Sequence, residues 1–199
     1  MTAKGTGVLL RSPDGATFRF DPGALCLEFA VTGGDEDQGA FETLRAPVDL
    51  ERWAESTLDL VMHTVTMRDL VEARRLRAAV WRLADARIAR RVLGADDVDA
   101  LNRSAARPPL VPRIDDQGRR VFAAPATATQ LLSTVARDAV DLFTGPFANR
   151  IRRCSGTNCT LVFVDTSRPG RRRWCSMERC GNRAKVNTFR QRQRKEDQP

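Results

Sequence analysis

Histidine, lysine and tyrosine are scarce in this chain of 199 residues. Histidine occurs once, as His63, lysine occurs three times, and tyrosine does not occur. A single imidazole excludes any metal site that needs two histidines, and it leaves any Ser/His/Asp arrangement dependent on one residue. We interpret His63 as a structural or surface residue.

Signatures of catalysis and of membrane insertion are also missing. The sequence has no P-loop, no G-x-G-x-x-G after a strand and no G-x-S-x-G. It has no run of about 18 uncharged apolar residues and no apolar signal segment at its start, so we expect a cytoplasmic protein without membrane contact. Cysteines in such a chain are more often metal ligands than disulfides. These absences favour a protein that is not an enzyme.

The charge is unevenly distributed along the chain. The formal net charge is +8, but residues 150–199 carry 14 Lys/Arg against 4 Asp/Glu, a net of +10, and residues 1–149 have a net of −2. Arginine-rich codon usage would raise the arginine content everywhere and does not explain this clustering. A basic block indicates a polyanion partner, usually nucleic acid and less often a membrane surface, although a solvated charged tail is the alternative.

The pattern of apolar residues predicts a mainly helical domain with short β-hairpins over residues 1–148. Turn sequences predict hairpins at 7–20 and 113–122 and a polar loop at 33–39. Residues 25–29 form an apolar segment of ambiguous type.

Helices are predicted at four places in this domain. Residues recurring at helical spacing favour one helix from Pro47, with an apolar stripe of Leu50, Trp53, Leu58 and Val61. The clearest helix covers 69–92 and is expected to end at Gly94. A short helix capped by Asp96 or Asp97 follows, and another covers 127–143.

Four of the five cysteines lie close together in the basic part of the chain. Cys154, Cys159, Cys175 and Cys180 form the pattern C-x4-C-x15-C-x4-C. Two close pairs joined by a spacer that folds back can place four thiolates at the corners of a tetrahedron, the arrangement that structural zinc prefers. Four thiolates leave no open position for water, so we predict one structural Zn²⁺ rather than a catalytic one; a redox or disulfide role is the alternative. Zinc binding would contribute on the order of 10 kcal/mol to folding so small a segment.

The residues around the cysteines predict a small α+β domain at 149–199, in which a β-hairpin precedes a basic helix in a treble-clef-like order. We expect the spacer to form the hairpin, with strands at 160–164 and 171–174 around a turn at 165–170. After Cys180, helical spacing places Arg183, Asn187, Arg190 and Arg194, here called the basic stripe, within about 60° of one another. Val186 and Phe189 fall to one side, where we expect them to pack on the metal core.

The forked guanidinium group of arginine can form paired hydrogen bonds with phosphate or guanine, and the asparagine amide can do so with adenine. This surface is therefore suited to nucleic acid. Aromatic residues that could stack on single-stranded bases are few, with Trp174 and Phe189 alone among the basic residues from Arg171 onward. The predicted nucleic-acid contacts are Arg171, Arg172, Arg173, Asn182, Arg183, Lys185, Asn187, Arg190 and Arg194.

The cysteine segment, with Phe163-Val164-Asp165-Thr166-Ser167, Trp174-Cys175-Ser176-Met177 and Cys180-Gly181-Asn182-Arg183, closely resembles the CGNR zinc-finger family over about 45 residues. In that family the finger follows a helical domain called ABATE, described as a stress-induced transcription regulator. The segment 25–30 is similar to the opening motif of that domain, except that Glu28 stands where the family usually has Asp. The resemblance implies zinc on the four cysteines and DNA binding in bacterial transcription control.

These observations lead to a zinc-containing DNA-binding regulator whose helical domain senses a small molecule or mediates homodimerisation. The choice of DNA over RNA rests on the resemblance alone. One alternative is a protein-interaction module in which the zinc site is purely structural and the basic helix docks on an acidic protein partner or on RNA polymerase. Another is an enzyme with its active site in a pocket of the helical domain.

Overall fold

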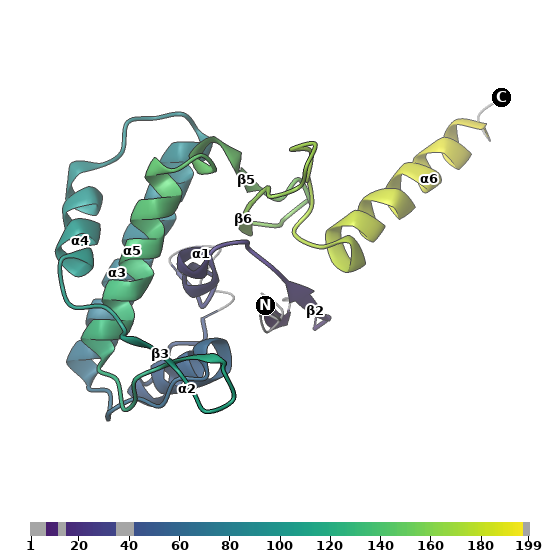
Figure 1. Ribbon diagram of the computed structural model, residues 1–199. Helices are drawn as coiled ribbons and strands as arrows, with labels where there is room; N and C mark the ends of the chain where they lie inside the picture. The colour runs from purple at the N-terminus through teal and green to yellow at the C-terminus, as the bar shows by residue number, and fades with distance from the viewer. Residues whose placement is uncertain (1–6, 12–14, 35–41, 197–199) are drawn as a thin grey trace.

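The computed structural model describes residues 7–11, 15–34 and 42–196 (Figure 1). Its elements are β1 (Val8–Arg11), β2 (Thr17–Phe20), α1 (Leu25–Ala30), α2 (Pro47–Leu58), α3 (Met67–Ile88), α4 (Ala95–Ala105), β3 (Pro112–Ile114), β4 (Arg120–Phe122), α5 (Ala128–Thr144), η2 (Ala148–Arg150), β5 (Ile151–Arg153), β6 (Val162–Val164), η3 (Met177–Gly181) and α6 (Asn182–Glu196). Most of the predicted loop at 33–39 and the turn residues 12–14 lie outside the described part. Within the described residues, no helix is both long and apolar enough to cross a membrane.

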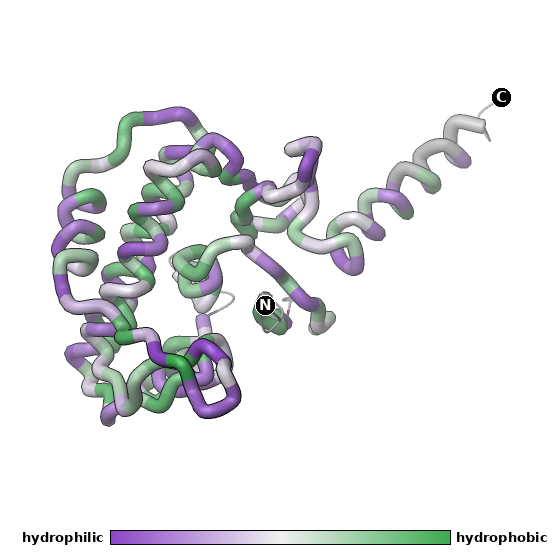
Figure 2. The backbone as a smooth tube through the Cα atoms, viewed as in Figure 1, coloured by the Kyte–Doolittle hydropathy of each residue, from purple (hydrophilic) through white to green (hydrophobic). Residues whose placement is uncertain are grey.

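The amino-terminal part is mainly helical, with two short antiparallel hairpins, as the sequence predicts. Helices α3 and α5 lie side by side, with α4 packed against both and α1 packed against both as well (Figure 1). Apolar and polar residues alternate along each of these helices (Figure 2), as expected for amphipathic helices around one core. The hairpins β1–β2 and β3–β4 form at the two predicted places, and the ambiguous segment is α1.

The ends of α3 differ from the prediction of a helix over 69–92. The helix begins at Met67 because Thr66 caps it: the Thr66 side chain accepts a hydrogen bond from Asp69 N, and the Asp69 carboxylate accepts one from Thr66 N. It ends at Ile88, since Arg90 adopts a left-handed φ of 54° and Arg91 N bonds back to Ala86 O. Gly94, expected to end α3, is instead the N-cap residue of α4.

Two smaller predictions about the helices are also corrected. Asp96 and Asp97 lie in the first turn of α4 and make no capping hydrogen bond, although acidic residues there still favour the helix dipole. Helix α2 ends at Leu58 because Asp59 takes a left-handed conformation. Val61 therefore lies beyond the helix and is 64% exposed rather than part of a buried stripe.

The carboxy-terminal residues 150–196, here called the cysteine module, contain a β-hairpin followed by a helix, as predicted. The strands of that hairpin are not the expected ones. Strand β6 pairs with β5, with Ile151 opposite Val164, and the segment 171–174 forms no strand. The residues before Cys154 pair with β6 instead because they are anchored on the helical part of the protein: Ile151 is buried, and Arg153 forms an ion pair with Asp85 of α3.

The cysteine module is attached to the helical part of the protein through the residues that follow β2 and through α3. Val164 N donates to Pro22 O at 2.8 Å, and the Arg172 guanidinium donates to Asp21 O at 2.9 Å. Arg153 forms an ion pair with Asp85 of α3. These contacts hold the β5–β6 hairpin and the spacer on the helical part, and α6 extends away from the rest of the molecule (Figure 1).

Candidate metal centre

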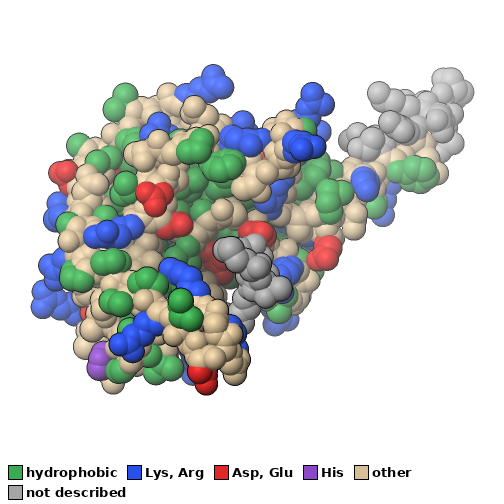
Figure 3. Space-filling model, in the orientation of Figure 1, with side chains coloured by type: hydrophobic (Ala, Val, Ile, Leu, Met, Phe, Trp, Pro, Cys, Tyr) green, Lys and Arg blue, Asp and Glu red, His purple; other side chains and the backbone are tan. Residues whose placement is uncertain are grey.

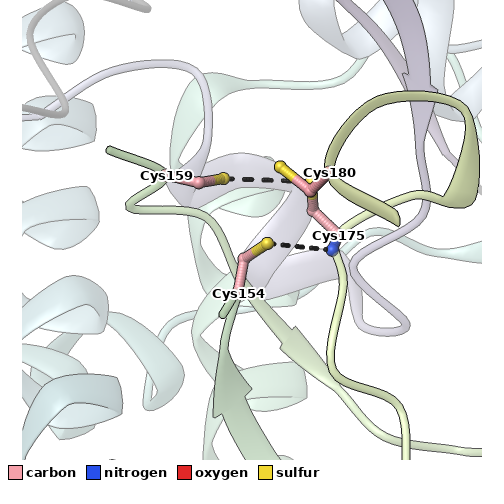
Figure 4. A group of neighbouring side chains, drawn as sticks. All are labelled: Cys154, Cys159, Cys175 and Cys180. Atoms are coloured by element: carbon pink, nitrogen blue, oxygen red, sulfur yellow. Dashed lines mark hydrogen bonds between the residues drawn. The ribbon is translucent and has the colours of Figure 1, made fainter. Parts of the chain in front are cut away.

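The four cysteines of the module come from two separate stretches of chain that the fold brings together (Figure 4). Cys154 follows β5 and Cys159 precedes β6, so the β5–β6 hairpin presents both at one end. Cys175 lies just before η3, and Cys180 lies within it. The β5–β6 hairpin therefore provides one pair of ligands, and the segment around η3 provides the other pair.

The arrangement of the four sulfur atoms fits a tetrahedral metal ion. All four Sγ atoms lie within 4.8 Å of one another, and Cys159 Sγ is 3.9 Å from Cys175 Sγ. Zinc–sulfur bonds of about 2.3 Å place tetrahedral thiolates about 3.8 Å apart. All four side chains are buried and none is in a disulfide. The cluster is a site for one Zn²⁺, with no position left for a substrate or water.

Hydrogen bonds around the sulfurs complete this site. Cys154 Sγ accepts from Cys175 N at 3.2 Å and from Gly156 N at 3.4 Å. Hydrogen bonds with Cys159 and Cys175 lower the pKa of Cys154, whereas burial and then the charge of Cys159 raise the pKa of Cys180 to about 12. Four thiolates packed this closely need a cation among them, and a divalent ion supplies that charge.

Arg179 is a member of this site that the sequence interpretation missed. Its side chain is buried, donates to Cys159 Sγ at 3.7 Å and stacks on the ring of Phe18 at 4.8 Å. Zinc with four thiolates carries a net charge of −2, so a buried guanidinium offsets part of it. Its position directly before Cys180 was the available signal, since second-shell donors orient metal ligands.

Asp165 is the second residue that the interpretation missed. The fully buried carboxylate accepts hydrogen bonds from Ser167 N, Ser167 Oγ and Arg172 N. Although burial raises the pKa of Asp165, these hydrogen bonds outweigh it and lower the pKa. The sequence Asp-Thr-Ser is typical of an Asx turn, and that pattern could have identified Asp165 as the residue that shapes the spacer.

Gly156 lies so close to the metal ligands that a side chain there should weaken zinc binding. A Cβ atom at Gly156 would stand 2.7 Å from Cys180 Sγ, and a sulfur held by zinc cannot retreat. We expect Gly156→Ala to lower zinc affinity about 10- to 100-fold, the usual effect of disturbing the groups around a metal site. Competition with a chromogenic chelator measures this.

Gly181→Ala is the matched control for that substitution. Its Cβ would meet Met177 Sδ at 2.6 Å, but Met177 is 51% exposed and its flexible end can move aside. Gly181→Ala should therefore retain most of the zinc affinity. Equal zinc affinity in Gly156→Ala and the unsubstituted protein would contradict the close packing around Cys180.

The structure separates the predicted nucleic-acid contacts into exposed and inward-facing groups. Arg172 faces inward: it stacks on Phe163 at 4.1 Å and donates to the carbonyls of Asp21, Trp174 and Cys175. Burial lowers its pKa. The structure describes the backbone of Arg194 but not its side chain. The other predicted contacts are exposed: Arg171, Arg173, Asn182, Arg183, Lys185, Asn187 and Arg190.

The expected packing of Val186 and Phe189 on the metal core is wrong. The side chains of Val186 and Phe189 are 46% and 61% exposed. Both residues belong to α6, which extends away from the cysteine cluster (Figure 1), and neither packs against the hydrophobic core. Instead, Phe163, Val164 and Leu161 of the β6 region fill the space beside the cysteines.

A helical domain followed by a hairpin, four clustered cysteines and a basic helix defines a zinc-finger protein with a separate helical region. Family models match both parts in this order: ABATE, described as "Putative stress-induced transcription regulator", at residues 23–146, and the CGNR zinc finger at residues 150–193. The chain belongs to the ABATE family and carries a CGNR zinc finger. A comparison with curated proteins finds none that matches it. Neither matched family is described as an enzyme.

Proposed function

We propose that this protein is a DNA-binding transcriptional regulator and that its cysteine module contacts the DNA. The observation that supports this most directly is the position of α6. The helix starts within two residues of the metal ligand Cys180 and carries exposed cationic side chains away from the body. A helix fixed at one end by a metal centre can enter a DNA groove without losing much conformational freedom on binding.

Charge and residue type along α6 match the chemistry of DNA. Arg183, Lys185 and Arg190 are suited to phosphates or guanine, and Asn182 and Asn187 are suited to adenine. Figure 3 shows basic side chains on the cysteine module and on the exposed part of α6.

A second cationic surface lies on the spacer of the module. Arg171 and Arg173 are exposed, and Arg173 stacks on Trp174 at 4.9 Å beside a hollow of about 420 Å³. Arg172 points inward from the same segment and holds the spacer in place. We therefore assign phosphate contacts to Arg171 and Arg173 and a structural role to Arg172.

Duplex binding measured against salt concentration tests the proposed function. About five phosphate contacts predict a slope near −4.5 for log affinity against log salt, which is a loss of roughly 500-fold between 50 and 200 mM. Fluorescence anisotropy with a mixed-sequence duplex, followed by selection for a preferred sequence, gives the measurement. Removal of zinc by a chelator should abolish binding, and a protein that binds no duplex at low salt would refute the proposal.

The exposed apolar side chains of α6 favour a second candidate, the protein-interaction module. Phe189 and Val186 stand beside the cationic residues and could bury against an acidic protein partner. In that case Arg183→Ala with Arg190→Ala would abolish capture of the partner and leave DNA binding unchanged. Loss of DNA binding in that variant favours the regulator.

The role of the helical domain, the division into domains at 1–148 and 149–199, and the cytoplasmic location remain predictions. We propose that the helical domain binds a small-molecule effector or forms a homodimer. A DNA ligand and reduced thiols both belong to the cytoplasm.

A further inference from the structure

Three residues of the basic stripe, Arg183, Asn187 and Arg190, face a groove whose other side is the amino-terminal hairpin. The groove, here called the hairpin groove, has a volume of about 430 Å³. Arg183, Asn187 and Arg190 line one side, and Thr17 and Phe18 of β2 line the other. Helical spacing alone predicted that the stripe residues share one face, but only the fold shows that this face lies opposite a hairpin from the other end of the chain.

The interior of the hairpin groove is positively charged. Arg179 lines it and is held by its stacking on Phe18 and its hydrogen bond to Cys159 Sγ. Among the described residues, no carboxylate forms an ion pair with Arg179, and its buried Nε has no hydrogen-bond partner. Glu178 is the single acidic residue among those lining the groove, against three arginines. The charge balance therefore favours an anionic occupant.

The hairpin continues this cationic surface on its outward side. Phe18 and Phe20 of β2 are buried, so Thr17 and Arg19 point to the opposite face, following the alternation of a strand. Arg11 of β1 stands directly across from Thr17 and shares that face. Because Thr17 also lines the groove, Arg11 places a guanidinium group beside this wall.

We propose that the hairpin β1–β2 forms the second wall of the DNA site, so that the sugar–phosphate backbone of a duplex lies in the hairpin groove between β2 and α6. This inference rests on the proposed function. The hairpin precedes both of the residue ranges that the family models match, 23–146 and 150–193. It assigns to β1 and β2 a role in binding that their sequence does not indicate.

A duplex backbone fits the groove better than a single strand does. Proteins that hold single strands stack successive bases on aromatic rings. The aromatic residue lining the groove, Phe18, is only 4% exposed and is covered by the Arg179 guanidinium. The groove offers guanidinium, amide and hydroxyl groups, which are donors to phosphate oxygens.

Substitutions of opposite charge at Thr17 test this inference. Thr17→Glu puts a carboxylate on the groove wall, where it repels phosphate, while its position opposite Arg11 preserves the hairpin. We expect duplex affinity to fall about tenfold and the salt slope to become shallower by about one unit. Thr17→Arg should do the reverse and bind several-fold more tightly, which a merely structural disturbance of the hairpin would not produce.

Ile114→Glu in the other hairpin is the matched control. Ile114 is exposed and stands opposite Arg120, so the substitution makes the same charge change in the same type of cross-strand pair, away from α6. Its duplex affinity should equal that of the unsubstituted protein. Zinc content and thermal unfolding of every variant show that each is folded.

The outcomes separate this inference from the proposed function. Unchanged affinity in both Thr17 variants, with loss of affinity in Arg183→Glu/Arg190→Glu, would refute the hairpin wall and leave DNA binding by α6 intact. Tighter binding of a single strand than of the duplex of equal length would refute the duplex assignment. Absence of any duplex binding by the unsubstituted protein would refute both proposals together.

Discussion

Replacing Cys154 and Cys180 with serine is expected to abolish zinc binding and to unfold the cysteine module. One residue comes from each pair of cysteines, so the double variant leaves a single ligand on each side of the site. The apolar residues beside the cysteines cannot hold so small a module together alone, and zinc contributes on the order of 10 kcal/mol to structures of this kind. Elemental analysis measures zinc per chain, and loss of the sharp thermal transition of the module reports its unfolding.

Cys26→Ala provides the control for this experiment. Cys26 is the fifth cysteine, and it is buried in α1, outside the cluster. This variant should keep one zinc per chain, although the buried cavity would lower the stability of the helical part. One bound zinc in Cys154→Ser/Cys180→Ser would show that other groups hold the metal.

Reversing the charge of Arg183 and Arg190 together is expected to weaken duplex binding on the order of 100-fold. Single arginines at a DNA interface contribute about 1–3 kcal/mol each, and glutamates at the same positions add repulsion. Both residues line the hairpin groove and both are exposed, so the substitutions should leave the metal centre intact. Anisotropy titrations at several salt concentrations give both the affinity and the slope.

Arg68→Glu/Arg103→Glu changes the net charge by the same amount on the helical part of the protein. Both residues are exposed, one in α3 and one in α4. If the general charge of the protein drove binding, both double variants would lose affinity equally. The proposal requires a large loss only for Arg183→Glu/Arg190→Glu, and equal losses would contradict a localised DNA site.

The helices of the body and the first hairpin were predictable because their signals are local. Apolar spacing in α3 and the turn sequence before β2 reflect contacts within a few residues. The start of α3 was missed because Thr66 lies just outside the apolar pattern and acts through a capping hydrogen bond. Its end was missed because Arg90 takes a left-handed conformation that glycine usually adopts.

The sequence by itself determined the four-cysteine pattern, the segregation of charge and the order of helical and basic parts. Only the tertiary structure decided that β5 pairs with β6, that Arg172 points inward, and that Val186 and Phe189 remain exposed. It also decided that a hairpin near residue 20 faces a helix near residue 185. The physical reason is separation along the chain: cysteine spacing and charge act locally, whereas packing between distant segments depends on which apolar surfaces they bury together.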